Sequence, residues 1–230
     1  AKSMLPFSVD EIKKAILEGA EVKAPGPDGI PLELYKVNPD FWSLIIANVF
    51  RATCVLGSLP SWSEAIIVPI FKEGDRGDPT CYQPISLMDS TVKVLGRVLL
   101  AKLESWAKDR TILSDLQYGF RGSMGTVERG FNLSLLVDKY TKAKEGRMYL
   151  GFMDLSSGFD CVVRSKLWSL MAEMGVDGHL IGIIRDIYSN CTARVRYGRG
   201  GECTAPFKLE RGVRQGCVLT PSCLHSISTA

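Results

Sequence analysis

Apolar and polar positions along the chain follow helical spacing in some segments and form short continuous runs in others. Residues 8–19 (SVDEIKKAILEG) place apolar side chains at helical spacing behind a serine and an acidic first turn, which predicts a capped helix. Residues 63–72 (SEAIIVPIFK) and 148–155 (MYLGFMDL) predict strands. Further helices are expected over 41–57, 90–109, 127–145, 165–175 and 178–190, a hairpin pair over 192–213, and a last helix after Pro221. Helices and strands without regular βαβ alternation indicate an α+β fold.

Composition narrows the class of protein but does not identify it. The 230 residues suffice for one large domain or two small ones, and 46% apolar with 23% charged residues is ordinary for a soluble globular protein. The apolar runs are too short to span a bilayer. Seven cysteines without a CxxC pair, and only two histidines, argue against a disulfide framework or a zinc site and for a reducing compartment.

The strand predicted over 148–155 ends in a carboxylate, Asp154, followed by SSGFD. A carboxylate at the end of a strand is a hard oxygen ligand that can bind Mg²⁺, and the main-chain carbonyl of Leu155 is a natural second ligand. Phe159 would form the wall of a pocket beside that metal. The alternative is that Asp154 only caps the loop or helix that begins at Ser156. Both interpretations stay open on this stretch alone.

Two other stretches carry basic residues suited to phosphate. Lys72 stands at the end of its predicted strand, where a point charge can meet a phosphate. Residues 211–221 (RGVRQGCVLTP) suit packing against a nucleotide or a template base. Residues 190–216 hold six basic side chains against two acidic ones, a local charge of +4 compared with +3 for the whole chain. Such a density of basic residues suits binding to a nucleic-acid phosphate backbone, although the solvent-exposed face of a hairpin would show the same sequence pattern. The six are Arg194, Arg196, Arg199, Lys208, Arg211 and Arg214.

Five segments, taken in order, resemble one known family. They are KAPGPDGIPLELYK, IIVPIFKEGDRGDPTCYQPISL, LQYGFRGSMGT, GFMDLSSGFDCV and RGVRQGCVLTP. Together they resemble the reverse transcriptase domain of non-LTR (LINE-type) retrotransposons, over residues 8–221. The resemblance implies a right-hand polymerase fold and RNA-templated DNA synthesis from dNTPs with Mg²⁺. It divides the chain into an N-terminal extension with the fingers (1–145) and the first part of the palm (146–230), with the thumb absent.

The resemblance also implies roles for individual residues. Asp154 matches the first catalytic aspartate, which binds the metal ions together with the carbonyl of Leu155. Lys72 matches the fingers lysine that contacts the incoming triphosphate. Phe159 matches the aromatic residue that contacts the deoxyribose and excludes ribonucleotides. Asp160 matches a second acidic residue, for which we expect a structural role because alternation points it away from Asp154.

Other positions match or depart from the family pattern. Gln215 and Gly216 match the Gln-Gly pair that lines the nucleotide pocket. Gln83 stands where the family usually has an arginine, so a neutral amide replaces a guanidinium that can grip phosphate oxygens in bidentate fashion. Gly158 stands where alanine is usual, which loosens the backbone there.

The family's aromatic-x-Asp-Asp motif is absent from the sequence. We therefore expect a chain truncated before that motif and inactive in isolation, since one carboxylate cannot hold two metal ions. The expected partners are an RNA template, a DNA primer and dNTP, with no membrane, in the nucleus or cytoplasm. The alternative is a non-catalytic remnant that binds RNA or a protein partner. A group II intron or telomerase-type polymerase fits the sequence segments APGPDGIP and PISL less well.

Overall fold

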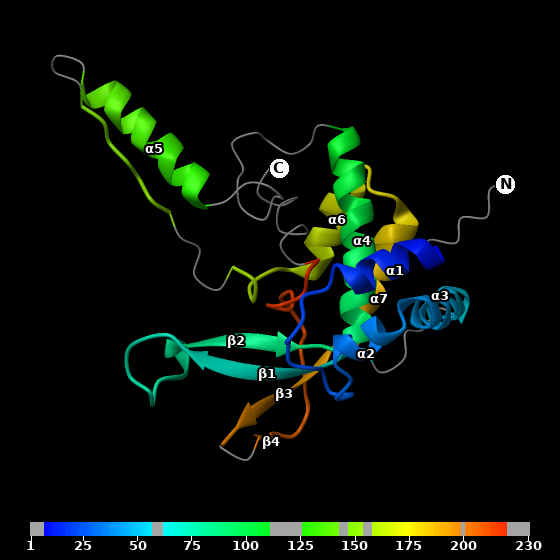
Figure 1. Ribbon diagram of the computed structural model, residues 1–230. Helices are drawn as coiled ribbons and strands as arrows, with labels where there is room; N and C mark the ends of the chain where they lie inside the picture. The colour runs from blue at the N-terminus through cyan, green and yellow to red at the C-terminus, as the bar shows by residue number, and fades with distance from the viewer. Residues whose placement is uncertain are drawn as a thin grey trace.

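A mixed sheet flanked by helices forms the framework of the molecule (Figure 1). The computed structural model describes residues 7–56, 62–110, 126–142, 147–153, 158–198 and 201–219. The strands are β1 (Glu64–Phe71), β2 (Tyr82–Leu87), β3 (Thr192–Tyr197), β4 (Glu202–Cys203) and β5 (Phe207–Lys208). Their order is β2-β1-β3-β4, with β5 also paired to β3. Strand β1 pairs antiparallel with β2 and parallel with β3, so the first hairpin and the predicted C-terminal hairpin share one sheet.

The β1–β2 hairpin contains a proline in each strand. The prediction of β1 is confirmed, whereas β2 was not predicted. The N–H of Lys72 donates to the carbonyl of Cys81 at 2.9 Å. Hydrogen-bonded and non-hydrogen-bonded pairs alternate from there, so the Pro69–Pro84 pair falls at a position where neither residue donates across the hairpin. The same alternation turns the N–H of Ser86 away from β1, toward the outer edge of β2.

The helices pack mainly against one another and against the start of the sheet. They are α1 (Val9–Leu17), α2 (Leu32–Val37), α3 (Pro39–Leu56), α4 (Ser90–Asp109), α5 (Thr126–Thr141), α6 (Arg164–Glu173) and α7 (Gly178–Tyr188). The predicted helices are thus confirmed, except that α2 was not predicted and that the helix expected after Pro221 lies outside the described residues. Ile12, Phe50, Leu95, Leu99 and Ile184 are at most 1% exposed. Their burial ties α1, α3, α4 and α7 into one core.

The loop that leads into α2 is fastened to the start of α4. The N–H of Asp28 donates to Asp89 Oδ1 at 3.1 Å, and the hydroxyl of Ser90 donates to the carbonyl of Ile30 at 2.7 Å. A Cβ at Gly26 would lie 2.2 Å from the main-chain nitrogen of Asp89, so only glycine allows this approach. Asp89 is 8% exposed and is therefore a buried carboxyl group.

The strand predicted over 148–155 is not confirmed. Residues 147–153 lie in none of the described strands, and residues 154 and 155 fall outside the described residues. Tyr149, Phe152 and Met153 are 86–93% exposed. A strand exists through hydrogen bonds to a neighbouring strand, and none of the described strands is paired with this segment, so its β-prone composition alone does not make it one. Among the described residues, no helix is long and apolar enough to cross a membrane.

Candidate functional site

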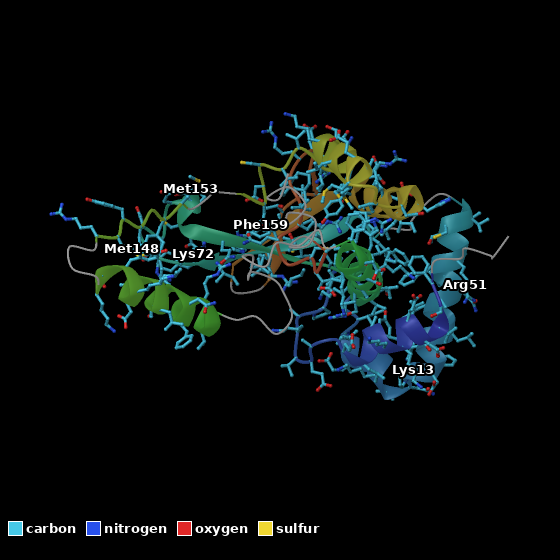
Figure 2. The ribbon with its side chains drawn as sticks, turned by 90° about the horizontal axis from the view of Figure 1, so that it is seen from above. Lys13, Arg51, Lys72, Met148, Met153 and Phe159 are labelled. Carbon is cyan, nitrogen blue, oxygen red and sulfur yellow. The ribbon has the colours of Figure 1, made fainter. Side chains whose placement is uncertain are left out.

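The turn that holds Phe159 is joined to the segment that precedes Gln215. The N–H of Val213 donates to the carbonyl of Phe159, and the N–H of Gly212 donates to the carbonyl of Val162, both at 2.9 Å. Gly212 has φ +79°, and a Cβ there would lie 2.9 Å from the Cα and the carbonyl oxygen of Asp160. Only glycine fits such a close, left-handed position. Phe159 is half-buried in the middle of the molecule (Figure 2).

The same segment continues to the outer edge of β2. The outward N–H of Ser86 donates to the carbonyl of Gln215 at 2.9 Å. Gly216 has φ +107°, and a Cβ there would lie 3.0 Å from the carbonyl oxygen of Ser86. Two of the residues predicted to line a nucleotide pocket therefore lie against β2. Through Val213, they are also linked to the turn of Phe159.

Lys72 and Gln83 lie toward the far end of the same hairpin. Gln83 is paired with Ile70, two residues before Lys72, and strand alternation gives Lys72 and Gln83 the same face. Lys72 is exposed and Gln83 is half-buried. Figure 2 shows Lys72 near the outer end of the hairpin, away from Phe159. Gln83 is three residues from Ser86, about 10 Å along the strand. Lys72 thus stands at a distance from Gln215 rather than in contact with it.

Arg194 and Arg196 lie on the face of the sheet that carries Lys72 and Gln83. Arg194 is paired with Ile66 across β1 and β3, and Arg196 follows two residues later. Arg194 Nε lies 2.7 Å from Glu64 Oε1, which neutralises part of its charge. Arg196 is half-buried, and its Nε is buried without a hydrogen-bond partner in the described part of the chain. Arg211 is exposed, whereas Arg199 lies outside the described residues.

Arg214 requires a correction to the predicted basic surface. Its side chain is 3% exposed, and its guanidinium donates to the main-chain carbonyls of Trp62 and Ser63. A phosphate contact needs an accessible guanidinium, so the placement of Arg214 contradicts this prediction. Sequence reasoning also missed Arg164, which contacts the segment before Gln215. An arginine at the start of a predicted helix gives no local signal of such a contact.

The predicted metal ligands cannot be placed. Asp154 and Leu155 lie outside the described residues, and within those residues no three His, Cys, Asp or Glu side chains are grouped so that they could hold a metal ion. Asp160, which follows Phe159, is exposed. Its Cα and carbonyl oxygen are the atoms of Asp160 that lie closest to Gly212.

Comparison with known proteins defines the class to which this arrangement belongs. The family model described as reverse transcriptase (RNA-dependent DNA polymerase) matches residues 70–228. The chain therefore belongs to the reverse transcriptase family. The matched region contains the β1–β2 hairpin from Ile70 onward, the turn of Phe159 and the segment of Gln215.

Individual relatives come from mobile elements. The chain is 29% identical over 231 residues to the probable RNA-directed DNA polymerase from transposon X-element of Drosophila melanogaster, covering 96% of this chain and 24% of that protein. It is 30% identical over 229 residues to the corresponding protein from transposon BS of the same species, with 98% and 24% covered. A Pol polyprotein from retrotransposable element R2 of Popillia japonica is 26% identical over 226 residues, with 96% and 30% covered.

These relatives confirm the resemblance to non-LTR retrotransposon reverse transcriptases that the five sequence segments predicted. The chain spans about a quarter of the length of the first two relatives. Similarity over nearly the whole of this chain thus concerns one part of those proteins.

Proposed function

We propose that the protein synthesises DNA on an RNA template from dNTPs, and that this chain supplies the residues that bind the incoming nucleotide. The observation that carries the proposal is the linkage of residues 212–216 to both Phe159 and β2 by main-chain hydrogen bonds. In this arrangement Gln215 and Gly216 line the nucleotide pocket, and Phe159 meets the deoxyribose. Residues 1–145 would form the N-terminal extension and fingers, and residues 146–230 the first part of the palm.

The triphosphate would extend toward the outer end of the β1–β2 hairpin. Lys72 is exposed there and shares a face with Gln83, so both side chains can approach one ligand. A lysine provides a charge-assisted contact to a phosphate, whereas a glutamine amide provides a weaker neutral one. The nucleotide would thus lie along the hairpin, with its base end near Gln215 and its phosphates near Lys72.

Mg²⁺ would be held by Asp154 and the carbonyl of Leu155. When bound, it would supply charge stabilisation for the transferring phosphoryl group. Within the described residues, which do not include Asp154 and Leu155, no three His, Cys, Asp or Glu side chains are grouped so that they could hold this ion, so the proposal rests on the sequence position of Asp154 and on the family.

The template and primer would lie near the basic residues of the C-terminal hairpin. Arg194, Arg196, Arg199 and Arg211 are the candidates, and Arg214 is left out because it is buried. In β3, Arg194 is ion-paired with Glu64, whereas the Nε of Arg196 lacks a hydrogen-bond partner among the described residues, so Arg196 is the best single probe. Each phosphate contact contributes about 0.7–0.9 to the slope of log affinity against log salt.

A second candidate function is nucleic-acid binding without catalysis. It is favoured by Gln83, which offers the triphosphate a neutral amide in place of a guanidinium. The two functions differ in whether dNTP incorporation occurs at all. Salt-sensitive binding of RNA without incorporation would support the second.

Kinetics on the full-length protein with an RNA template and a DNA primer test the proposed function. Lys72→Ala should raise the KM for dNTP by about 10- to 150-fold, because it removes one charge-assisted contact worth about 1.5–3 kcal/mol. Gln83→Arg should lower that KM. Lys108→Ala, at an exposed lysine of α4, is the matched control and should leave KM unchanged.

Nucleic-acid binding provides a second readout. Arg196→Ala should reduce the slope of log RNA affinity against log salt by about 0.7–0.9, the contribution of one phosphate contact. Arg185→Ala, at an exposed arginine of α7, should leave that slope unchanged. No incorporation by the wild type, or a KM unaffected by both Lys72→Ala and Gln83→Arg, would contradict the nucleotide assignment.

A further inference from the structure

We propose that Arg164 and Arg214 are positioning residues that hold residues 211–216 in place and thereby fix Gln215 and Gly216 against β2 and Phe159. The inference rests on the proposed function, because Gln215 and Gly216 matter to catalysis only if they line the nucleotide pocket. It gives two arginines a role in shaping that pocket without contact to the nucleotide.

Arg164 holds the beginning of the segment. Its Nε donates to the carbonyl of Gly212 at 2.7 Å, and its Nη2 donates to the carbonyl of Arg211 at 3.2 Å. Its Nη1 donates to the carbonyl of Tyr188 at 3.1 Å. One guanidinium thus joins two consecutive carbonyls of the segment to the end of α7. The planar fork of arginine suits such multiple donation, which a lysine cannot reproduce.

The location of Arg164 supports a specific role for these contacts. Arg164 is the first residue of α6, where the positive end of the helix dipole disfavours a cation. An acidic residue would be the better choice at this position for helix stability alone. The three carbonyls that accept from Arg164 offset this cost, since hydrogen bonds to a charged donor are stronger than neutral ones.

Arg214 holds the middle of the segment from inside the molecule. Its Nη1 donates to the carbonyl of Trp62 at 3.3 Å, and its Nη2 donates to the carbonyl of Ser63 and lies 3.0 Å from Cys191 Sγ. Trp62 and Ser63 directly precede β1, and Cys191 directly precedes β3. Arg214 therefore anchors the segment to the starts of two neighbouring strands. Gln215 follows immediately and accepts the outward N–H of β2.

The two arginines also converge on one ring. The guanidinium carbon of Arg164 lies 5.4 Å, and that of Arg214 lies 5.9 Å, from the ring centroid of Tyr188. Both distances are within the range of cation–π contacts. Tyr188 is 3% exposed, so the ring provides a rigid buried support. Loosening either arginine should therefore release the segment locally without unfolding the distant α1–α3 packing.

Hydrogen exchange and kinetics on the full-length protein test the inference together. The variants are Arg164→Gln, Arg214→Lys and, as a matched control on the surface of α7, Arg185→Gln. We expect both positioning variants to raise amide exchange about five- to tenfold in peptides that cover 209–217, with little change over α1. We expect the KM for dNTP to rise about tenfold, with kcat changed less than about threefold. Arg164→Lys should recover part of the KM loss by donating to one carbonyl.

Four outcomes would decide against part of the proposal. Unchanged exchange over 209–217 in both variants would overturn the positioning role. Raised exchange with an unchanged KM would show that the segment does not shape the nucleotide pocket. A salt slope of RNA affinity reduced by about one in Arg214→Gln, which removes the charge that Arg214→Lys keeps, would favour a direct phosphate contact instead. Absence of incorporation by the wild type would overturn the proposed function, and the exchange result would then decide the positioning role alone.

Discussion

Helices α4 and α5 have similar apolar content but opposite surroundings. In α4, Leu95 and Leu99 are at most 1% exposed, whereas in α5 Phe131 and Leu135 are 62% and 52% exposed. Figure 1 shows α4 in the middle of the packed helices and α5 projecting from them. The sequence pattern predicts a helix in both cases, yet only α4 has neighbouring surfaces that bury its apolar side chains. Helix formation and burial are therefore separate properties of this chain.

The proposed nucleotide pocket draws on both kinds of region. Phe159, Gln215 and β2 belong to well-connected structure, held together by main-chain hydrogen bonds. The segment that leads toward Asp154 resembles α5 instead, since Phe152 and Met153 are 86% and 93% exposed. The residues proposed to position a nucleotide are thus packed more firmly than the segment that precedes the predicted metal ligand.

The sharpest test of this comparison removes the same side chain from each helix. Leu99→Ala should lower the free energy of unfolding by about 3–5 kcal/mol, because it deletes buried methyl groups and leaves a cavity. Leu135→Ala should change it by less than about 0.5 kcal/mol, because that side chain is half exposed. Chemical denaturation measures both. Equal losses in the two variants would show that α5 is buried in solution.

Asp89 lies in the packed region, and its burial predicts that the free energy of unfolding depends on pH. Burial, together with the neighbouring carboxylates of Asp28 and Glu64, raises the pKa of Asp89 from 3.8 to about 6, although Lys93 lies nearby. Between those values the folded state keeps a proton that the unfolded state has lost. Stability should therefore fall as pH rises from about 4 to 6, by at most about 3 kcal/mol, and stay low above that.

The substitution Asp89→Asn checks this assignment. It should flatten the pH profile of unfolding and raise stability at pH 7, because the amide oxygen can still accept the N–H of Asp28. Asp109→Asn, at the exposed end of the same helix, should leave the profile unchanged. A wild-type profile that rises between pH 4 and 6 would contradict the raised pKa.

The smallest expected effect concerns the capping box of α1. The side chain of Ser8 accepts from the N–H of Glu11 at 3.1 Å, and the N–H of Ser8 donates to Glu11 Oε2 at 2.9 Å. Ser8→Ala should cost about 1 kcal/mol in the free energy of unfolding. Ser134→Ala, in the exposed helix α5, should cost nothing measurable. A larger loss of unfolding free energy in Ser134→Ala than in Ser8→Ala would contradict the view that α5 is less firmly packed than the helical core.

Much of the framework could be predicted because local signals agreed with tertiary packing. Helix α4 was predicted with its observed ends, and the capping signal of Ser8 was confirmed. Strand β2 escaped prediction because Pro84 argues against a strand, and the proline is acceptable only because it lies on an edge strand at a non-hydrogen-bonded pair. For residues 147–153 a strand was predicted and is not observed. Their side chains favour a strand, but a strand also needs a neighbouring strand to pair with, which the local sequence does not provide.

The site could be predicted only where family motifs or chain order indicated it. The motifs suggested that Phe159 and Gln215 act together, and the structure links them through Val213. They could not show that Arg214 is buried, because an arginine in a basic stretch looks the same whether it meets phosphate or main-chain carbonyls. The contacts of Arg164 join residues 48 positions apart, which no local pattern encodes.

The most direct test of reverse transcriptase function is primer extension by the full-length protein on an RNA template with Mg²⁺ and dNTPs. We predict incorporation by the wild type and by Asp160→Asn, and its complete loss in Asp154→Ala. Incorporation that survives Asp154→Ala, or that fails equally in Asp160→Asn, would contradict the assignment of Asp154 as the metal-binding catalytic residue.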